Sequence, residues 1–442
     1  MKNIKKIPQL DRKKWQRKVR NKKRLPIFLQ FFSSVVEYYD FFSFSFIFFY
    51  LIGTVSHQTI ELYGIALISL VTFLFRPVGY RVQIWLTQHY SRKIVIIING
   101  TMMTVSILIP GLITTVDDSP WLICGIIFLS RVINGISFGI KLQSNVTYIK
   151  YSFPKRLRYT IATSTLGAQL GLSLSVFINH AVTQYLSIQQ LEWGWRIPFF
   201  FGALLSLILF ATRFLTYSRL NGLTDLTMKI PLDKFAFKAG KKLWLGLIII
   251  STKACITYTI FISIPFLIGS NLDLNLNQVT QVMFITSSLN TLTSWVSKYN
   301  KRSPKLSSIN YALILSLILM TVLIYAMINK LQILSFSSIY LLGILNGYLF
   351  VVIPRLIECT LPEEVKFESM LFISNYEYFH FNVIRRLALL ITLVVMGSSF
   401  TRYHLMIVLM GSLWAAIIPG IFALSYLYYK NRQKIRQMNS FS

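Results

Sequence analysis

The chain has 442 residues, of which 54% are hydrophobic and only 14% are charged. A soluble protein of this size does not bury so much apolar surface in one core, so the composition excludes an ordinary soluble protein and favours a polytopic membrane protein. The net charge is +30, and the basic residues are concentrated in the N-terminal tail and in alternate loops. This distribution is typical of a membrane protein whose basic segments lie at an anionic membrane surface, rather than of a nucleic-acid-binding protein.

The predicted membrane spans are apolar runs of about 20 residues. After a basic tail over residues 1–25, clear runs occupy residues 28–53, 60–80, 94–116, 121–142, 160–182, 197–217, 243–269, 308–329, 333–355 and 403–428. Two weaker runs cover residues 279–297, which are polar but uncharged, and about 369–400. With both accepted, the sequence predicts an all-α polytopic membrane protein with twelve transmembrane helices.

The charges of the connecting loops alternate along the chain and orient the predicted helices. If the N-terminus is cytoplasmic, the cytoplasmic connections carry the basic residues at 92–93, 150–158, 219–242, 298–305 and 366. The opposite loops are poor in Lys and Arg and hold acids such as Asp117 and Asp118. The positive-inside rule therefore places both termini in the cytoplasm, and removing either weak span spoils the alternation downstream.

The longest connection, residues 218–242, follows the sixth predicted span. It divides the chain into an N-terminal six-helix bundle over residues 26–217 and a C-terminal six-helix bundle over residues 243–428, followed by a basic tail over residues 429–442. Two bundles of six helices joined by a basic cytoplasmic linker are typical of a secondary transporter. A twelve-span protein without transport activity is the alternative interpretation.

Two carboxylates, Glu37 and Asp40, interrupt the first apolar run. They are three residues apart and so project from nearby directions of one helix. They lie about 16 and 21 Å along the helix from Pro26, which favours the membrane interior over hydration at the interface. A carboxylate buried there can carry a proton or bind a cation.

Two lysines are candidate partners for these acids or for an anionic substrate. Lys141 lies toward the cytoplasmic end of the predicted fourth helix and either snorkels to the interface or faces a central cavity. Lys253 lies about ten residues into the predicted seventh helix, with no acid evident nearby on that helix. It is therefore a candidate for binding an anionic group.

Several stretches resemble the major facilitator superfamily and are most similar to its metabolite:proton symporter branch, which includes transporters of proline/betaine, citrate, 2-oxoglutarate and shikimate. They are "VVEYYDFFSFSF", "FLFRPVGYRVQIWLTQHYSRK", "SRVINGISFGIKLQSNVTYIKYSFPKRLRYT", "LGAQLGLSLS", "WGWRIPFFFGALL" and, more weakly, "YLFVVIPRLIECTLPEEVKF". The resemblance covers residues 25–217 well and the second half weakly. It implies that the first and seventh helices line a central cavity, and it identifies no substrate.

The chain departs from the family pattern at charged positions. In the loop after the second helix the usual Gly and Asp are replaced by Ile84 and Gln88, whereas Arg92 is retained. Lys141 stands where the family has an acid, and Lys150 aligns with its usual Glu. These losses put proton coupling by the usual route in doubt. Two alternatives to proton symport therefore stay open: an uncoupled facilitator or exchanger, and a non-transporting receptor or scaffold with the same fold.

Further charged residues are candidates for gating or ion pairing. Arg76 belongs to the "RP" segment near the expected cytoplasmic end of the second helix, where packing and contact with the membrane surface are its simplest roles. Glu358 is expected to pair with Arg355 one turn earlier. Glu377 and Arg385 lie either within an eleventh helix or at the membrane interface beside it.

The sequence contains no nucleotide-binding loop, metal cluster or nucleophile–base pair that rises above chance, so we expect neither an enzyme nor a cofactor. We predict a secondary transporter of a bacterial inner membrane that moves a small carboxylate-bearing organic solute, an osmolyte or an organic acid, by alternating access with proton coupling. Its expected partners are the solute, the proton and the lipid bilayer, and not nucleic acid. The carboxylate preference comes from Lys253, which a substrate carboxylate would neutralise.

The predicted topology is testable by labelling single cysteines placed near Asp118 and Lys234. A membrane-impermeant thiol reagent added outside intact cells is expected to modify the first position and to spare the second. Labelling of the Lys234 position from outside, with protection at Asp118, would show that the orientation is wrong.

Overall fold

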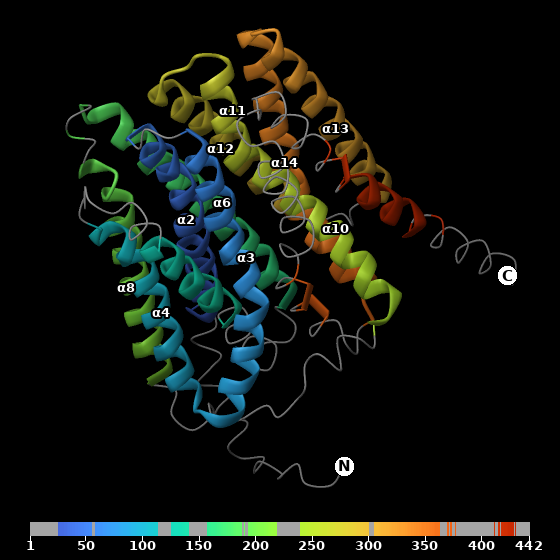
Figure 1. Ribbon diagram of the computed structural model, residues 1–442. Helices are drawn as coiled ribbons and strands as arrows, with labels where there is room; N and C mark the ends of the chain where they lie inside the picture. Colours follow the sequence, from blue (N-terminus) through green and yellow to red (C-terminus); the bar gives the residue numbers. More distant parts are fainter. Residues whose placement is uncertain are drawn as a thin grey trace, which may run out of the picture.

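The computed structural model describes residues 25–54, 58–113, 125–140, 157–187, 190, 193–218, 239–299, 305–362, 369–370, 372–373, 376, 411, 414–415, 417–427 and 429. These residues form helices and short connections, and no strand occurs among them. The helices lie side by side in a bundle (Figure 1).

Ten helices and one π-helical segment carry labels. They are α2 (Leu25–Thr54), α3 (Gln58–His89), α4 (Arg92–Leu112), α6 (Leu157–Tyr185), α8 (Ile197–Ser218), α10 (Lys241–Tyr258), η3 (Thr259–Ser263), α11 (Ile264–Asn271), α12 (Leu276–Tyr299), α13 (Leu306–Ile328) and α14 (Gln332–Thr360). Two shorter apolar helices cover Gly125–Ile140 and Ile417–Leu427.

The helices coincide with the predicted spans over most of the chain. Each expected span from 28–53 to 333–355 overlaps a described helix, and the polar run 279–297 forms the continuous helix α12. The second helix is longer than its predicted span, since α3 continues from residue 80 to His89. The expected span 369–400 lies almost wholly outside the described residues, as do the terminal tails and residues 219–238.

Five helices within the described ranges are long and apolar enough to cross a membrane: Ile94–Leu112, Ile197–Leu215, Lys241–Gly269, Leu306–Ile328 and Gln332–Thr360. Helices α6 and α12 are more polar, because each carries several Ser, Thr, Asn and Gln side chains along its length. A membrane-embedded helix tolerates such residues when they face other helices instead of lipid.

The helices pack first within each half of the chain and then across the two halves. In the first half α2 lies against α6 and α8, and α4 lies against α8. In the second half α14 contacts α10, α12 and α13. Helix α6 also packs along α12, so these two helices join the halves.

Glycines spaced four residues apart allow three of these helix pairs to approach closely. A Cβ atom at any of them would run into the backbone of the neighbouring helix, so a larger side chain is excluded there. The pairs are Gly135 and Gly139 against α3, Gly167 and Gly171 against α2, and Gly343 and Gly347 against α12.

Prolines lie inside three of the described helices, α3, α4 and α14, and a π-helical segment interrupts the seventh span. Pro77 lies inside α3 and removes the backbone N–H that would bond the carbonyl of Phe73. On the seventh span, α10 passes through the π-helical segment η3 before Pro265 opens α11. Such interruptions are common where a membrane helix lines a binding site.

The close approach at Gly139 is testable with one added methyl group. In Gly139→Ala the new Cβ meets backbone atoms of Arg76, Gly79 and Tyr80, so we expect the detergent-solubilised protein to lose about 1–3 kcal/mol of stability. The matched control is Gly125→Ala on the same helix, where nothing lies within 4 Å. Equal thermal midpoints for the two variants would contradict the packing.

Candidate functional site

Most of the charged side chains that the sequence placed inside the apolar spans are buried, where described. A charge in this environment requires a compensating group, so these residues mark the candidate site. The buried charged residues are Glu37, Asp40, Arg76, Arg131, Arg196, Arg213, Lys253 and Glu358.

Asp40 and Arg131 form an ion pair in the core of the first half. The Arg131 guanidinium lies 3.6 Å from Asp40 Oδ2, and both side chains are almost fully buried. Asn134, one turn along the same helix, donates a hydrogen bond from its Nδ2 to the same oxygen at 2.5 Å. One carboxylate oxygen of α2 therefore receives a charge and an amide from the helix Gly125–Ile140.

Helix α4 completes the cluster around this pair. The backbone carbonyl of Ser106 accepts hydrogen bonds from Ser130 Oγ at 3.0 Å and from Arg131 Nη2 at 3.5 Å, and Ser106 Oγ accepts from Asn134 at 3.3 Å. The guanidinium carbon of Arg131 also lies 4.1 Å from the centroid of the Phe44 ring. Hydrogen bonds and a ring face thus supplement the carboxylate in stabilising the buried cation.

Arg131 was not among the site residues chosen from the sequence, which considered Lys141 as a partner for the acids of the first helix. In the structure the basic partner of Asp40 is Arg131, and Lys141 lies outside the described residues. The signal was available, because Arg131 is an ionisable residue inside the apolar run 121–142. Its distance of 91 positions from Asp40 hid the pairing.

Lys253 contacts the ring of Phe350, and this ring in turn contacts Tyr38 of the first helix. Lys253 is buried on α10, and its Nζ lies 4.2 Å from the centroid of the Phe350 ring of α14. Phe350 contacts Tyr38 edge to face, with 6.0 Å between the ring centroids. Glu37, the residue before Tyr38 on α2, is also buried.

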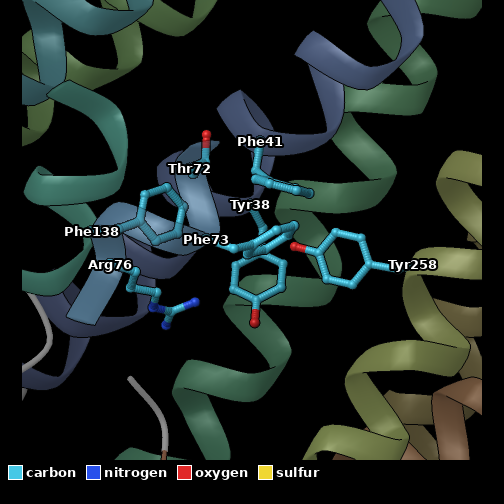
Figure 2. Close-up of a pocket in the computed structure, with 7 residues that line it drawn as sticks. All are labelled: Tyr38, Phe41, Thr72, Phe73, Arg76, Phe138 and Tyr258. Atoms are coloured by element: carbon cyan, nitrogen blue, oxygen red, sulfur yellow. The ribbon is translucent and has the colours of Figure 1, made fainter. Parts of the chain in front are cut away.

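A pocket opens beside this region between the two halves. Its enclosed volume is about 10 Å³, which is room for about one water molecule, and the space counted out to its open mouth, with solvent included, is about 290 Å³. It is lined by Tyr38 and Phe41 of α2, Thr72, Phe73 and Arg76 of α3, Phe138 of the helix Gly125–Ile140, and Tyr258 of α10 (Figure 2).

Arg76 is packed in the interior, as one of its two predicted roles requires, but it lies farther from the end of its helix than predicted. The sequence suggested packing or surface contact near the end of the second helix, whereas the structure buries Arg76 and places it in the pocket lining. The cause is the length of α3, which continues 13 residues beyond Arg76 to His89 and leaves the arginine inside the bundle.

The remaining predicted gating residues are more dispersed. Gln88 is exposed near the end of α3, whereas Glu358 is buried near the end of α14. Arg355, its expected partner, donates hydrogen bonds to the carbonyl oxygens of Ser297 at 3.2 Å and Lys298 at 2.8 Å.

The side chain of Arg92 lies outside the described part of the chain, as do Glu377 and Arg385. Across the described ranges, no group of three or more His, Cys, Asp or Glu side chains is placed to hold a metal ion.

A chain of amides links the halves of the molecule. Asn290 of α12 donates to Gln169 Oε1 of α6 at 2.5 Å and accepts from Asn346 of α14 at 3.0 Å. Thr257 of α10 donates to Asn346 Oδ1 at 2.8 Å. All four side chains are buried, so this amide chain connects three helices of the second half to one helix of the first.

Hydroxyl groups extend this contact along α6 and α12. Ser173 lies 2.6 Å from the Thr291 hydroxyl and donates to the Ser287 carbonyl at 2.9 Å. Further along, Thr280 Oγ1 lies 3.0 Å from His180 Nδ1 and 2.9 Å from Thr183 Oγ1. We call these contacts, together with the bond between Gln169 and Asn290, the polar seam.

The family model of the Major Facilitator Superfamily matches residues 30–368 of the chain. Among curated proteins, one from Staphylococcus haemolyticus named as a proline/betaine transporter is 30% identical over 142 residues, which is 31% of this chain and 30% of that protein. The citrate-proton symporter of Salmonella typhi is 27% identical over 192 residues, covering 40% of this chain and 42% of the symporter. The matched region thus spans less than half the length of either relative.

Solved structures share the arrangement of the helices over nearly the whole chain. The crystal structure of a D-xylose-proton symporter superposes with a TM-score of 0.68, covering 91% of this chain and 96% of the symporter, at 12% sequence identity. The superposition shows a common fold, whereas a sequence identity this low carries no information about the substrate.

The amide chain is testable through Asn290. In Asn290→Ala both Gln169 Oε1 and Asn346 Nδ2 lose their hydrogen-bond partner in a buried position, so we expect a loss of about 1–3 kcal/mol for each group left unsatisfied. The matched control is Thr293→Ala on the same helix, because Thr293 bonds the Leu289 carbonyl of its own helix. Similar thermal midpoints in detergent for the two variants would contradict the role of Asn290.

Proposed function

We propose that this chain, which belongs to the major facilitator superfamily and is a multi-pass membrane transporter, moves a small carboxylate-bearing solute. In this proposal the solute crosses the membrane together with protons, by alternating access. The observation that carries the coupling is the buried Asp40, which is held by Arg131 and Asn134. The proline/betaine and citrate-proton relatives support the solute class, because both names describe solutes with a carboxylate.

Asp40 has the properties of a proton carrier. In its ionised form it is stabilised by the guanidinium at 3.6 Å and by the Asn134 amide at 2.5 Å. A proton added to Asp40 removes the negative charge and leaves Arg131 as an uncompensated buried cation, which is strongly unfavourable. The protonated state therefore favours any rearrangement that gives the guanidinium a new acceptor.

The proton site and the pocket are structurally connected. Thr72 lines the pocket, and its hydroxyl lies 3.5 Å from the backbone carbonyl of Arg131. Phe41, another lining residue, directly follows Asp40 on α2. A shift of the helix Gly125–Ile140 on protonation thus reaches the solute pocket through groups that already touch both.

The polar seam supports motion of one half against the other. Its hydrogen bonds between α6 and α12 join hydroxyl, amide and carbonyl groups, all of which are chemically able to bond water instead. A seam of this kind opens at lower free-energy cost than an interlocked apolar core, because water replaces each broken hydrogen bond. Alternating access requires such a separable contact.

The proposal is tested in proteoliposomes with Asp40→Asn. Given an inward proton gradient, we expect the parental protein to accumulate at least one labelled solute from a panel of glycine betaine, proline, citrate and 2-oxoglutarate. The variant is expected to lose this accumulation, falling to the level of protein-free liposomes, because Asn does not carry the proton. It should still exchange labelled for unlabelled solute, since exchange needs no net proton transfer.

Asp273→Asn is the matched control, because Asp273 forms an exposed ion pair with Lys330 at 2.8 Å and lies away from the buried cluster. Gradient-driven accumulation by Asp40→Asn at the parental rate would show that Asp40 is not the coupling residue. Exchange without accumulation in the parental protein would identify an uncoupled exchanger instead. Failure of every solute in the panel to move would favour the receptor or scaffold hypothesis.

A further inference from the structure

A histidine lies at one end of the polar seam. His180 of α6 is partly buried, and its Nδ1 lies 3.0 Å from Thr280 Oγ1 of α12. The Thr280 hydroxyl donates to the carbonyl of Asn277 on its own helix at 2.9 Å, so its oxygen is left to accept the N–H of the imidazole. A neutral imidazole with its proton on Nδ1 makes this bond, and His180 needs no charge to hold the two helices together.

The imidazole also stacks on an aromatic ring of the other half. Its centroid is 5.7 Å from that of Phe284, one turn along α12 from Thr280, and the two rings are inclined by only 16°. Phe177, one turn before His180 on α6, contacts the same Phe284 ring at 5.7 Å. One face of the imidazole is therefore covered by carbon atoms instead of water.

This contact lies at the end of the seam that the predicted topology places outside. His180 is five residues before the end of α6 at Tyr185, and Thr280 is four residues after the start of α12 at Leu276. The contact therefore closes one end of the interface between the halves, and it must separate when the interface opens there.

The two helices that make this contact bring no carboxylate to His180. Neither α6 nor α12 contains an Asp or a Glu. Their basic residues, Arg158 and Lys298, stand at the opposite ends of the helices, about 27 to 33 Å away along the axes. Asp273, three residues before α12, pairs with Lys330 at 2.8 Å in an exposed position.

The charged groups of the other elements packed against α6 lie farther along the bundle. Ser43 of α2 contacts Ser175 of α6 at 3.0 Å, which places Asp40 roughly 12 Å from the level of His180. Arg196, just before α8, donates to the carbonyl of Ile113. Tyrosines on these helices are neutral between pH 5 and 8. The remaining charged or titratable groups on α2, α8 and α14 lie nearer the predicted cytoplasmic ends, and they are Glu37, Arg213, Arg355, Glu358 and Cys359.

A second proton on the imidazole makes a cation at this contact. The Phe284 face and the Thr280 oxygen both attract the cation, but a phenylalanine ring is a weaker partner than a tryptophan ring and a hydroxyl carries no charge. The cost of removing an ion from water without a counter-ion is larger than these attractions. Separation of α6 from α12 returns the imidazolium to water, so protonation favours the separated state.

We infer that His180 is a pH-sensitive latch, in which the neutral imidazole holds α6 against α12 and the imidazolium releases them. The inference rests on the proposed alternating access, because a latch acts only on an interface that opens. Imidazole titrates near pH 6.5 in water, within the range that a proton gradient covers. In the predicted orientation, an acidic exterior then opens the same face from which Asp40 receives its proton.

The test measures the distance between two nitroxide labels across the seam by double electron–electron resonance. The labels are attached at Tyr185→Cys and Asn275→Cys, both exposed positions, in a full-length protein whose three native cysteines are replaced by alanine. In detergent we expect mainly a short distance at pH 8. At pH 5.5 the ratio of the long-distance to the short-distance population should rise at least about fivefold. Identical distributions at the two pH values would overturn the inference.

Variants at position 180 assign the pH response. His180→Gln keeps a neutral N–H group for Thr280 and does not titrate in this range, so its labels should stay close at both pH values. His180→Lys is charged at both, so its labels should be far apart at both. The matched control is His89→Gln, because His89 bonds the Trp85 carbonyl of its own helix at 2.8 Å. A pH response that persists in His180→Gln would contradict the latch.

Asp40 is separated from His180 by the same measurement. The pH response should remain in Asp40→Asn, and its loss there would assign it to Asp40 and overturn the latch. The proposed function fails differently. A pH-dependent distance in a protein that accumulates no solute in proteoliposomes would support the latch and overturn transport. Proton-driven accumulation by a protein whose label distance does not respond to pH would support transport and overturn the latch.

Discussion

The pairing of Asp40 with Arg131 is the interaction on which the first half of the structure depends. Neither charge is tolerated alone in an apolar bundle, so the helices that carry them must remain adjacent. Asn134 and Ser106 extend the pair to α4, and Thr72 extends it to α3. Four helices are thereby fixed around one carboxylate, and a proton that neutralises this carboxylate changes the electrostatic balance for all of them.

The contact between the two halves uses polar side chains, whereas the close helix contacts within each half use glycines. Within each half, glycines bring the backbones of neighbouring helices into van der Waals contact. Between the halves, α6 and α12 meet through hydroxyls and amides. The aromatic pocket also spans the halves, because Tyr258 comes from the second and the other described lining residues from the first.

The candidate site was predictable in part. Glu37 and Asp40 stand out in the sequence because a carboxylate inside an apolar run is costly, and the structure buries both. Arg131 carries the same signal, but nothing local indicates which acid it meets. Arg76 was expected near the cytoplasmic end of the second helix, in packing and surface contact, because the length of α3 beyond Pro77 was not evident. Gln169, Asn290 and Asn346 gave no signal, since uncharged amides are common in membrane helices and their bonding depends on neighbours far along the chain.

The sequence by itself determined the helical class, the positions of most helices and the presence of charges within them. These properties depend on the local density of apolar side chains and on the length needed to cross a bilayer, and both can be counted along the chain. Only the tertiary structure decided the partner of Asp40, the lining of the aromatic pocket and the polar seam. Each of these joins residues from different helices, and their contacts depend on helix rotation and on close approach at glycines, which the order of residues in one helix does not specify.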